Sequence, residues 1–308
     1  MQPWTMGARA VALLLACVSP AVLAEVSAAE PRPLCSLPTN NDGPLVQETT
    51  LAGVPAILRI PTHISRPPII LWHGFGPPAS ERAMMDALPL DDVGAVKVYL
   101  GLPLFGARTP DGGMKEVGRR QAEDVGLLVF KPVVVGAADE LPHVVTALQK
   151  NGCVQRGAPV ALVGFSAGGA AALDALSQSK VAIDAAVFIN ASTGLSASIQ
   201  AYEKATGKTY AWSPASRELA HETDAVDHVA EIAAHRPALL FLQGTDDSVI
   251  DSSAANQLVD HLKPFYGEHL QQIQLVRPAG MTHQWAADPA ALAEVRKTAS
   301  DWLAGQHP

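Results

Sequence analysis

Short apolar runs alternate along the chain with longer segments whose apolar residues recur at helical spacing. The apolar runs are continuous rather than alternating with polar residues, which is typical of strands covered on both faces. The stretch "LVQETTLAGVPAILRIP" predicts two strands around an Ala-Gly turn, an opening hairpin. Further strands are predicted in "PPIILWHG", "GAVKVYLGLP", "PVALVGFS", "AIDAAVFINA", "PALLFLQG" and "IQLVRPAG".

Helices are predicted between and after these strands, at residues 80–88, 141–150, 168–180, 252–263 and 288–303. We expect Ser252 or Ser253, and Asp288, to cap the last two helices, because their side chains can accept from free N–H groups. Strands that alternate with helices predict an α/β fold. Its sheet should be mainly parallel, with about eight strands, right-handed crossovers and an antiparallel edge contributed by the hairpin.

Two connections are longer than a crossover needs. One runs from 101 to about 140, and the other from about 192 to 236. Both leave the carboxyl end of the sheet, where open α/β sheets bind ligands. We therefore expect them to form pocket walls or a small cap or lid, the second as a cap-like insertion. The alternative is surface elaboration without a function.

The chain has 308 residues, 48% of them hydrophobic, and a formal net charge of −8. This length allows one large domain or two small ones, with enough residues to bury a core. Since the chain has no basic run, neither nucleic acid nor an anionic membrane surface is an expected partner.

The N-terminal residues 1–24 have the pattern of a secretory signal peptide. A positive charge at Arg9 precedes an apolar stretch, and the small residues before Ala24 match a cleavage site. The apolar stretch is too short to span a membrane. We predict a secreted or periplasmic protein with a proline-rich leader at 25–44. A lipoprotein anchored at Cys17 and a buried N-terminal helix are the alternatives.

Two cysteines, Cys35 and Cys153, remain after the predicted cleavage. Export permits a disulfide between them, which would tie the leader to the turn before the central strand. The alternative is two unpaired thiols. No Cys/His spacing in the sequence suggests a structural zinc site.

The stretch "LVGFSAGGAA" places Ser166 between an apolar strand and a helix of small residues. A turn this tight leaves no room for side chains at Gly164 and Gly168, and it strains the backbone of the serine. The strain exposes the hydroxyl above the carboxyl edge of the sheet, and the helix N-terminus behind it favours negative charge. Ser166 is therefore predicted to be a nucleophile.

A serine nucleophile needs a histidine base that an acid orients. Of the ten histidines, His283 follows a strand-like run near the C-terminus, in "VRPAGMTHQW". The alternative is that His283 is an ordinary polar loop residue. Five other histidines lie in charged helical surroundings and are expected to be solvated: His221, His228, His235, His261 and His269.

The stretch "LLFLQGTDDSVID" places two aspartates just beyond a strand end. Here the sequence resembles the α/β-hydrolase superfamily, whose members commonly carry a Gly-x-x-Asp turn after the seventh strand. The resemblance implies Asp247 as the triad acid, with Asp246 as the alternative. The chain order Ser166, Asp247, His283 is also that of the α/β hydrolases.

An acyl-transfer site needs two N–H donors for the developing oxyanion. Ala167, the residue after the nucleophile, supplies one. The stretch "HGFG" from His73 to Gly76 resembles the superfamily's oxyanion motif, which implies the N–H of Phe75 as the second. His73 itself is expected to be structural rather than a base, and the alternative for "HGFG" is an ordinary glycine turn.

The resemblance spans residues 45–308, which we assign as the α/β-hydrolase domain. Within the superfamily the chain is most similar to compact, exported esterase-like members related to the dienelactone hydrolases and to prolyl oligopeptidase catalytic domains. True dienelactone hydrolases have a cysteine nucleophile, and this chain has Ser166 instead. The resemblance therefore does not imply dienelactone hydrolysis.

No cofactor is expected, because the sequence has no phosphate-binding loop and no dinucleotide-binding glycine motif. The stretch "HETDAVDH" at 221–228 holds histidines and acids, but we interpret it as a charged helix face rather than a metal site.

The predicted function is that of an exported serine hydrolase that cleaves small carboxylic esters through an acyl-enzyme. Its activity should fall at acidic pH, when His283 takes up a proton. A serine peptidase or amidase with the same triad is the alternative, followed by a hydrolase fold that only binds a ligand. The sequence does not specify the acyl group or the leaving group.

Overall fold

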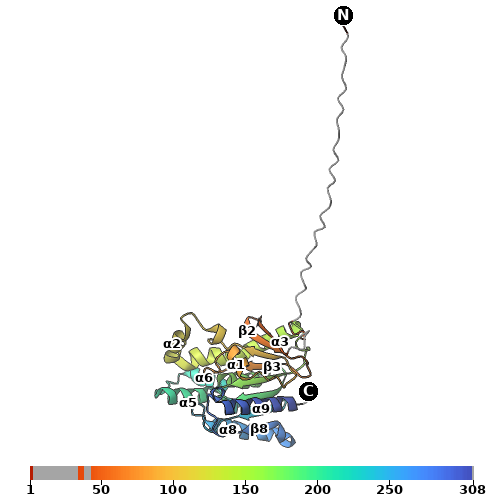
Figure 1. Ribbon diagram of the computed structural model, residues 1–308. Coiled ribbons are helices and arrows are strands. Elements are labelled where there is room, and N and C mark those ends of the chain that lie inside the picture. Colours follow the sequence, from red (N-terminus) through yellow and green to blue (C-terminus); the bar gives the residue numbers. More distant parts are fainter. Residues whose placement is uncertain (3–33, 38–42, 307–308) are drawn as a thin grey trace. The chain divides into compact units, whose positions relative to one another are not determined.

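All the predicted strands form, and in the described part of the chain they make one eight-stranded sheet (Figure 1). The strands are β1 (Leu45–Leu51), β2 (Val54–Ile60), β3 (Ile69–Trp72), β4 (Lys97–Leu100), β5 (Val160–Phe165), β6 (Ile183–Ile189), β7 (Ala238–Leu242) and β8 (Ile273–Val276). Their order across the sheet is β1-β2-β4-β3-β5-β6-β7-β8.

The hairpin supplies an antiparallel edge, as predicted. Strands β1 and β2 pair antiparallel around Ala52 and Gly53, which both have positive φ. Strand β2 also pairs antiparallel with β4, and every further pair in the sheet is parallel. This arrangement confirms the α/β-hydrolase fold.

This computed structural model describes residues 1–2, 34–37 and 43–306. The chain divides into units 1–32 and 33–308, and all the described helices and strands belong to the second. The predicted signal peptide (apart from residues 1–2) and most of the predicted leader lie outside the described residues.

The five predicted helices also form. They are α1 (Glu81–Ala87), α3 (Gly136–Lys150), α4 (Ala167–Gln178), α8 (Ser252–Tyr266) and α9 (Pro289–Gly305). Asp288 caps α9 as predicted, since its carboxylate accepts from the N–H groups of Ala290 and Ala291. The prediction of a serine cap for α8 was wrong by one residue. Asp251 caps this helix and accepts from the N–H of Ser253.

The two long connections are largely helical. The first contains a short 3₁₀ turn η1 (Gly106–Arg108), α2 (Gly113–Val125) and a π-helical segment η2 (Gly126–Val135) that runs directly into α3. The second contains α5 (Leu195–Thr206), α6 (Pro214–Thr223), a 3₁₀ turn η3 (Ala225–His228) and α7 (Val229–Ile232). Two more 3₁₀ turns, η4 (Gly267–Gln272) and η5 (Trp285–Ala287), precede β8 and α9, respectively. None of the described helices has the length and hydropathy of a transmembrane segment.

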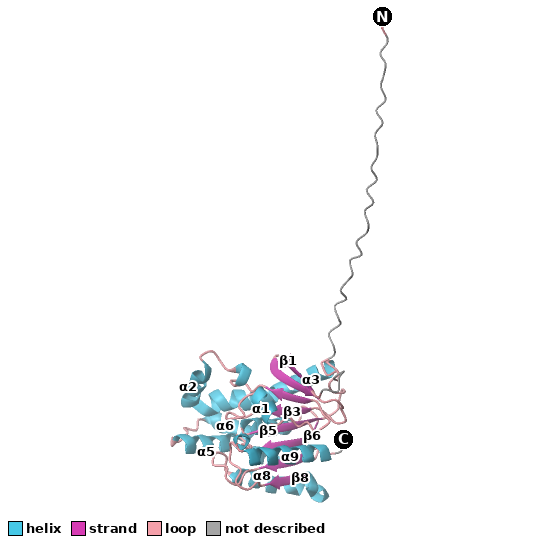
Figure 2. Ribbon diagram, in the orientation of Figure 1, coloured by secondary structure: helices cyan, strands magenta, loops and turns pink. Residues whose placement is uncertain are grey.

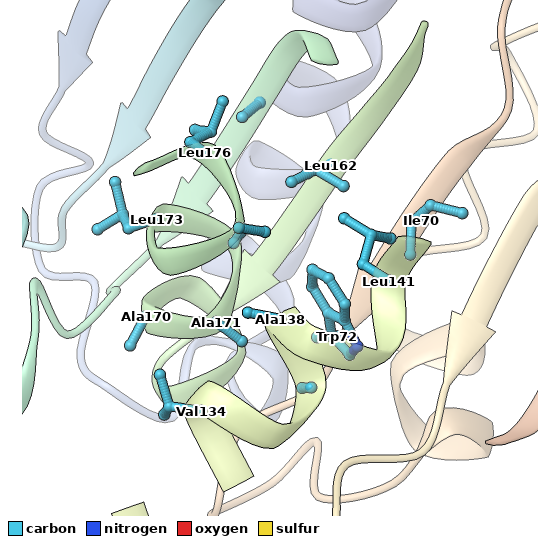
Figure 3. Close-up of a cluster of buried hydrophobic side chains, with 14 of the residues drawn as sticks. Ile70, Trp72, Val134, Ala138, Leu141, Leu162, Ala170, Ala171, Leu173 and Leu176 are labelled. Carbon is cyan, nitrogen blue, oxygen red and sulfur yellow. The ribbon is translucent and has the colours of Figure 1, made fainter. Parts of the chain in front are cut away.

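Helices cover both faces of the sheet (Figure 2). Helices α1 and α9 pack on one face. On the other face, α3, η2, α4 and α8 bury a larger apolar cluster. Figure 3 shows its centre, where Ile70 and Trp72 of β3 and Leu162 of β5 lie beneath Leu141 of α3 and Ala171 of α4. The small residues of α4 let that helix lie close to the strands. Its N-terminus lies at the carboxyl edge of the sheet because α4 begins directly after the end of β5.

The structure forms the predicted disulfide between Cys35 and Cys153, whose Cα atoms are 5.1 Å apart. It connects the described piece of the leader to the turn between α3 and β5 across 118 residues of sequence. Such a link limits the unfolded chain more than the folded one, and so it stabilises the native state.

Candidate active site

Ser166 occupies the sharp turn between β5 and α4, with φ 53° and ψ −116°. This is a strained backbone conformation for a residue with a side chain. The turn is as tight as the sequence predicts. A Cβ at Gly164 would lie 2.3 Å from the carbonyl oxygen of Gly168, and one at Gly168 would lie 2.4 Å from that of His73. Both positions therefore require glycine.

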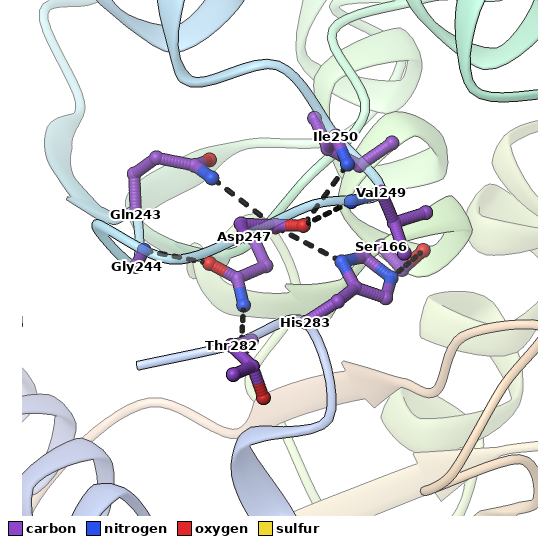
Figure 4. A network of polar contacts seen from close by, with 9 residues as sticks. Ser166, Gln243, Gly244, Asp247, Val249, Ile250, Thr282 and His283 are labelled. Carbon is purple, nitrogen blue, oxygen red and sulfur yellow. Dashed lines mark hydrogen bonds and ion pairs between the residues drawn. The ribbon is translucent and has the colours of Figure 1, made fainter. Parts of the chain in front are cut away.

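Ser166, His283 and Asp247 form one hydrogen-bonded chain at the carboxyl edge of the sheet (Figure 4). The Ser166 Oγ lies 3.1 Å from His283 Nε2, and His283 Nδ1 lies 3.0 Å from Asp247 Oδ2. Since an ionised carboxylate only accepts, His283 carries its proton on Nδ1 and presents the lone pair of Nε2 to the serine. Ser166 and His283 are each only 8% exposed.

The carboxylate of Asp247 has no exposed surface and is fully hydrogen-bonded. Its Oδ1 accepts from the N–H groups of Val249 (2.9 Å) and Ile250 (3.0 Å). Its Oδ2 accepts from Gln243 Nε2 (3.2 Å) as well as from His283. Asp246 is exposed and contacts Thr245 instead. The geometry therefore places Asp247, and not Asp246, beside the histidine.

Asn190, which the sequence analysis did not single out, holds the acid and histidine loops together. Its side chain is fully buried at the carboxyl end of β6. The Oδ1 atom accepts from the N–H of Gly244 at 2.8 Å, and Nδ2 donates to the carbonyl of Thr282 at 2.9 Å. Asn190 could have been identified as a polar residue that directly follows a buried strand, next to the strand that leads to Ser166.

The loop after β3 lies beside Ser166, since a Cβ at Gly74 would be 3.0 Å from the Cβ of Ser166. His73 is fully buried, and its Nδ1 lies 2.8 Å from the carbonyl of Gly74 while Nε2 accepts from the N–H of Leu102. Burial lowers the pKa of His73 to about 4, so the ring is neutral and Nδ1 donates. His73 thus fixes the backbone of this loop, and its ring nitrogens bond Gly74 and Leu102 rather than the triad.

The two predicted oxyanion donors border the same cavity as Ser166. Ala167 is the first residue of α4, so its N–H has no partner within the helix. Among the described residues, the N–H of Phe75 makes no hydrogen bond either. Phe75 also stacks on Phe105, with ring centroids 4.7 Å apart, which fixes its position. The arrangement leaves two free donors beside Ser166.

The cavity above the triad has a volume of about 300 Å³ and is mainly apolar. The two long connections supply most of its walls. The sequence predicts that these connections form pocket walls, but it does not indicate which of their residues line the cavity. One wall contains Gln121 and Val125 of α2 and Phe130 of η2, and the facing wall is α5, from Leu195 to Ala205. None of the described residues that line the cavity is an acid, a lysine or an arginine.

The charged segment 221–228 is separate from this cavity. His221 contacts Asp227 at 3.1 Å, and His228 contacts the carbonyl of His221 at 2.9 Å, both at the surface. Within the described residues, no group of three or more histidine, cysteine or acidic side chains could hold a metal ion.

The sequence matches the model of a known protein family. The model of the prolyl oligopeptidase family matches residues 136–307, more than half of the sequence. The chain belongs to the prolyl oligopeptidase family. It is accordingly a serine hydrolase of the α/β-hydrolase superfamily. A search of curated protein sequences found no match to this chain.

Solved structures share the fold of this prolyl oligopeptidase family member at low sequence identity. The structure of TT1662 from Thermus thermophilus has a TM-score of 0.64 and 18% identity, over 85% of this chain and 99% of the other. Carboxyl esterase 2 from the fungus Tuber melanosporum has a TM-score of 0.60 and 17% identity, over 90% and 91%. A puromycin-hydrolyzing peptidase from Mycobacterium tuberculosis has a TM-score of 0.58 and 18% identity, over 86% of this chain and 40% of the peptidase.

Proposed function

We propose that this protein is an exported serine esterase that cleaves small carboxylic esters with an uncharged, apolar acyl group. The observation that carries the proposal is the continuous chain from Ser166 through His283 to the buried Asp247, at the base of an apolar cavity. Because none of the described residues that line this cavity is an acid, a lysine or an arginine, it suits a neutral ester better than a charged peptide terminus.

In the proposed mechanism the Oγ of Ser166 attacks the acyl carbon while Nε2 of His283 takes the hydroxyl proton. The N–H groups of Phe75 and Ala167 bind the oxyanion of the tetrahedral intermediate. The intermediate collapses as His283 returns the proton to the leaving alcohol, which produces an acyl-enzyme. A water molecule then attacks the acyl carbon, His283 accepts its proton, and the acid is released with Ser166 restored.

A peptidase or amidase function is the second candidate, and the family itself favours it, because the matching model is that of prolyl oligopeptidases. The same triad could attack an amide, and His283 would then protonate the leaving amine as it protonates the leaving alcohol of an ester. A partner peptide would also need polar contacts along its backbone. The mainly apolar walls offer few of these.

Export is part of the proposal. The secretory pattern of residues 1–24 and the disulfide between Cys35 and Cys153 both support it, because disulfides persist in oxidising compartments. N-terminal sequencing of protein recovered from outside the cytoplasm should begin after Ala24. Recovery of the intact N-terminus in the cytoplasmic fraction would contradict export.

The test of activity compares p-nitrophenyl esters of rising acyl length with a peptide p-nitroanilide. We expect ester hydrolysis with KM falling about fourfold for each added CH₂ until the cavity is filled, since each buried CH₂ contributes about 0.8 kcal/mol. Ser166→Ala should abolish hydrolysis and labelling by a fluorophosphonate. Faster cleavage of the anilide would favour the peptidase, and absence of both activities together with an unlabelled Ser166 would refute the enzyme.

A further inference from the structure

Tyr210 connects the two walls of the cavity. It lies in the segment between α5 and α6, and its main-chain N–H donates to the carboxylate of Glu203 on α5 at 2.7 Å. Its hydroxyl lies 2.6 Å from Oδ1 of Asp124 on α2, a residue 86 positions earlier in the sequence. One residue therefore binds the α5 wall through its backbone and the α2 wall through its side chain.

Asp124 sits at a break in the first wall. Its backbone, with φ −159° and ψ 98°, is not helical and marks the point where α2 gives way to the π-helical η2. Besides the tyrosine hydroxyl, its Oδ1 accepts from the N–H of Leu127 at 2.9 Å. The same carboxylate oxygen therefore stabilises the break and binds Tyr210.

The surroundings of Tyr210 leave little freedom to the contact. A Cβ at position 126 would lie 2.7 Å from the tyrosine hydroxyl, so the approach requires Gly126. Tyr210 is 9% exposed, and its ring packs edge-to-face on Trp212, with centroids 5.1 Å apart. Burial and the hydrogen bond to Asp124 raise the pKa of the Tyr210 hydroxyl, so it remains a donor at neutral pH.

Tyr210 and Asp124 do not line the cavity, but their neighbours do. Gln121 and Val125 flank Asp124 along α2, and both face the cavity. On the other wall, Glu203 lies between Tyr202 and Ala205, which also face it. A change in the distance between Asp124 and Tyr210 is therefore passed to wall residues within one helical turn on each side.

We propose that the Tyr210–Asp124 hydrogen bond is a specificity determinant, which holds the α2/η2 wall and the α5 wall at the spacing that binds medium-length apolar acyl groups. Tyr210 is a positioning residue in this scheme, since it touches neither the triad nor the cavity. The inference rests on the proposed esterase function, and it names the acyl groups that the site selects. An acetyl group extends only one methyl from the carbonyl carbon and gains little from the walls, whereas an octanoyl chain must pack between them.

The experiment compares p-nitrophenyl acetate and octanoate on the wild type and on Tyr210→Phe, which removes only the hydroxyl. We expect KM for octanoate to rise about tenfold, because a hydrogen bond to a carboxylate is lost. The KM and kcat for acetate should change less than about twofold. Asp124→Asn keeps an oxygen that can accept from the tyrosine and should give a smaller rise. Asp124→Ala also removes the contact with the N–H of Leu127, so it should raise the KM for octanoate at least as much as Tyr210→Phe.

Tyr266→Phe is the matched control. The hydroxyl of Tyr266 donates to the carbonyl of Pro237 at 2.7 Å in the core beneath α8, away from the cavity. This variant loses one buried hydrogen bond, as Tyr210→Phe does, and should lower the melting temperature without changing the ratio of the two KM values. A parallel loss of acetate and octanoate activity in Tyr210→Phe, or an equal change of the ratio in Tyr266→Phe, would overturn the proposal.

A binding measurement separates this inference from the esterase proposal. Calorimetry with methyl octanoate on Ser166→Ala requires no catalysis, and the double variant with Tyr210→Phe should bind about tenfold more weakly. Binding that weakens in this way without hydrolysis in the wild type would refute the esterase and leave the inference standing. Ester hydrolysis with unchanged binding in the double variant, or no binding of methyl octanoate at all, would refute the inference.

Discussion

Replacement of Asp247 by asparagine tests the site most sharply, because it changes one atom in a fully buried group. In the native arrangement Oδ1 accepts from the N–H groups of Val249 and Ile250, and only an oxygen can do so. The asparagine oxygen should therefore take that place, which puts the amide nitrogen where Oδ2 now faces His283. The amide donates, so Nδ1 of the histidine must become an acceptor.

The magnitude follows from the tautomer. With Nδ1 unprotonated, the proton of a neutral His283 lies on Nε2, which points at Ser166 and can no longer act as a base. A wrong tautomer of this kind lowers kcat about 10⁴-fold, equivalent to about 5 kcal/mol in the barrier. The donors at Phe75 and Ala167 are not affected, so a residual activity above the uncatalysed rate should remain.

The assay is kcat for p-nitrophenyl butanoate, together with the rate of fluorophosphonate labelling at Ser166, which does not depend on the choice of ester. Asp246→Asn is the matched control. Its carboxylate is exposed and, among the described residues, accepts only from Thr245, so we expect a change of at most about twofold. The mechanism is wrong if Asp247→Asn keeps more than about a tenth of the wild-type rate, or if both variants lose activity equally.

Two further predictions concern stability. Reduction of the disulfide, or Cys35→Ser, should lower the free energy of unfolding by about 2–5 kcal/mol. In protein without residues 1–24, free thiols should appear only after reduction. An unchanged urea midpoint, or thiols that titrate without reductant, would contradict this prediction. Burial, aided by the charge of Asp139, raises the pKa of Asp174 to about 7. Between about pH 4 and pH 7 the folded state therefore keeps a proton that the unfolded chain releases, and the free energy of unfolding falls as the pH rises through this range. Asparagine at position 174 can still accept a hydrogen bond from Gln178 but carries no charge. Asp174→Asn should therefore raise the free energy of unfolding by a few kcal/mol at pH 8 and change it little at pH 4. Equal effects at both pH values would contradict this prediction.

The strands and the main helices could be predicted because their apolar pattern and their length agree. The segment 126–135, "GLLVFKPVVV", could not. Its β-branched residues favour a strand, and Pro132 opposes a helix, yet the segment forms the π-helical η2. Phe130 and Val133 are buried in the core, and the segment packs against α4 and α6. Packing of this kind is not encoded in the local sequence pattern. Helix α2 did have a local signal in the pairs that Glu116 makes with Arg119 and Arg120.

The three residues of the proposed triad were predictable for a different reason. Ser166, Asp247 and His283 each follow a strand, and parallel strands end at the same edge of the sheet. The groups that hold them, such as Asn190, act through backbone atoms of distant loops and leave no spacing to recognise. The contact between Asp124 and Tyr210 was beyond sequence analysis altogether, because it depends on how two separate insertions fold toward each other.

The glycines around Ser166 have a consequence for the evolution of such hydrolases. Gly164 and Gly168 bring the backbones of β3, β5 and α4 into direct contact, so Ser166 cannot shift unless the sheet shifts with it. The walls of the cavity, by contrast, belong to helices in two insertions that contribute nothing to the sheet. Substrate preference can therefore drift by substitution in α2, η2 and α5 while the chemistry is inherited unchanged, and close relatives are expected to differ in what they cleave before they differ in how.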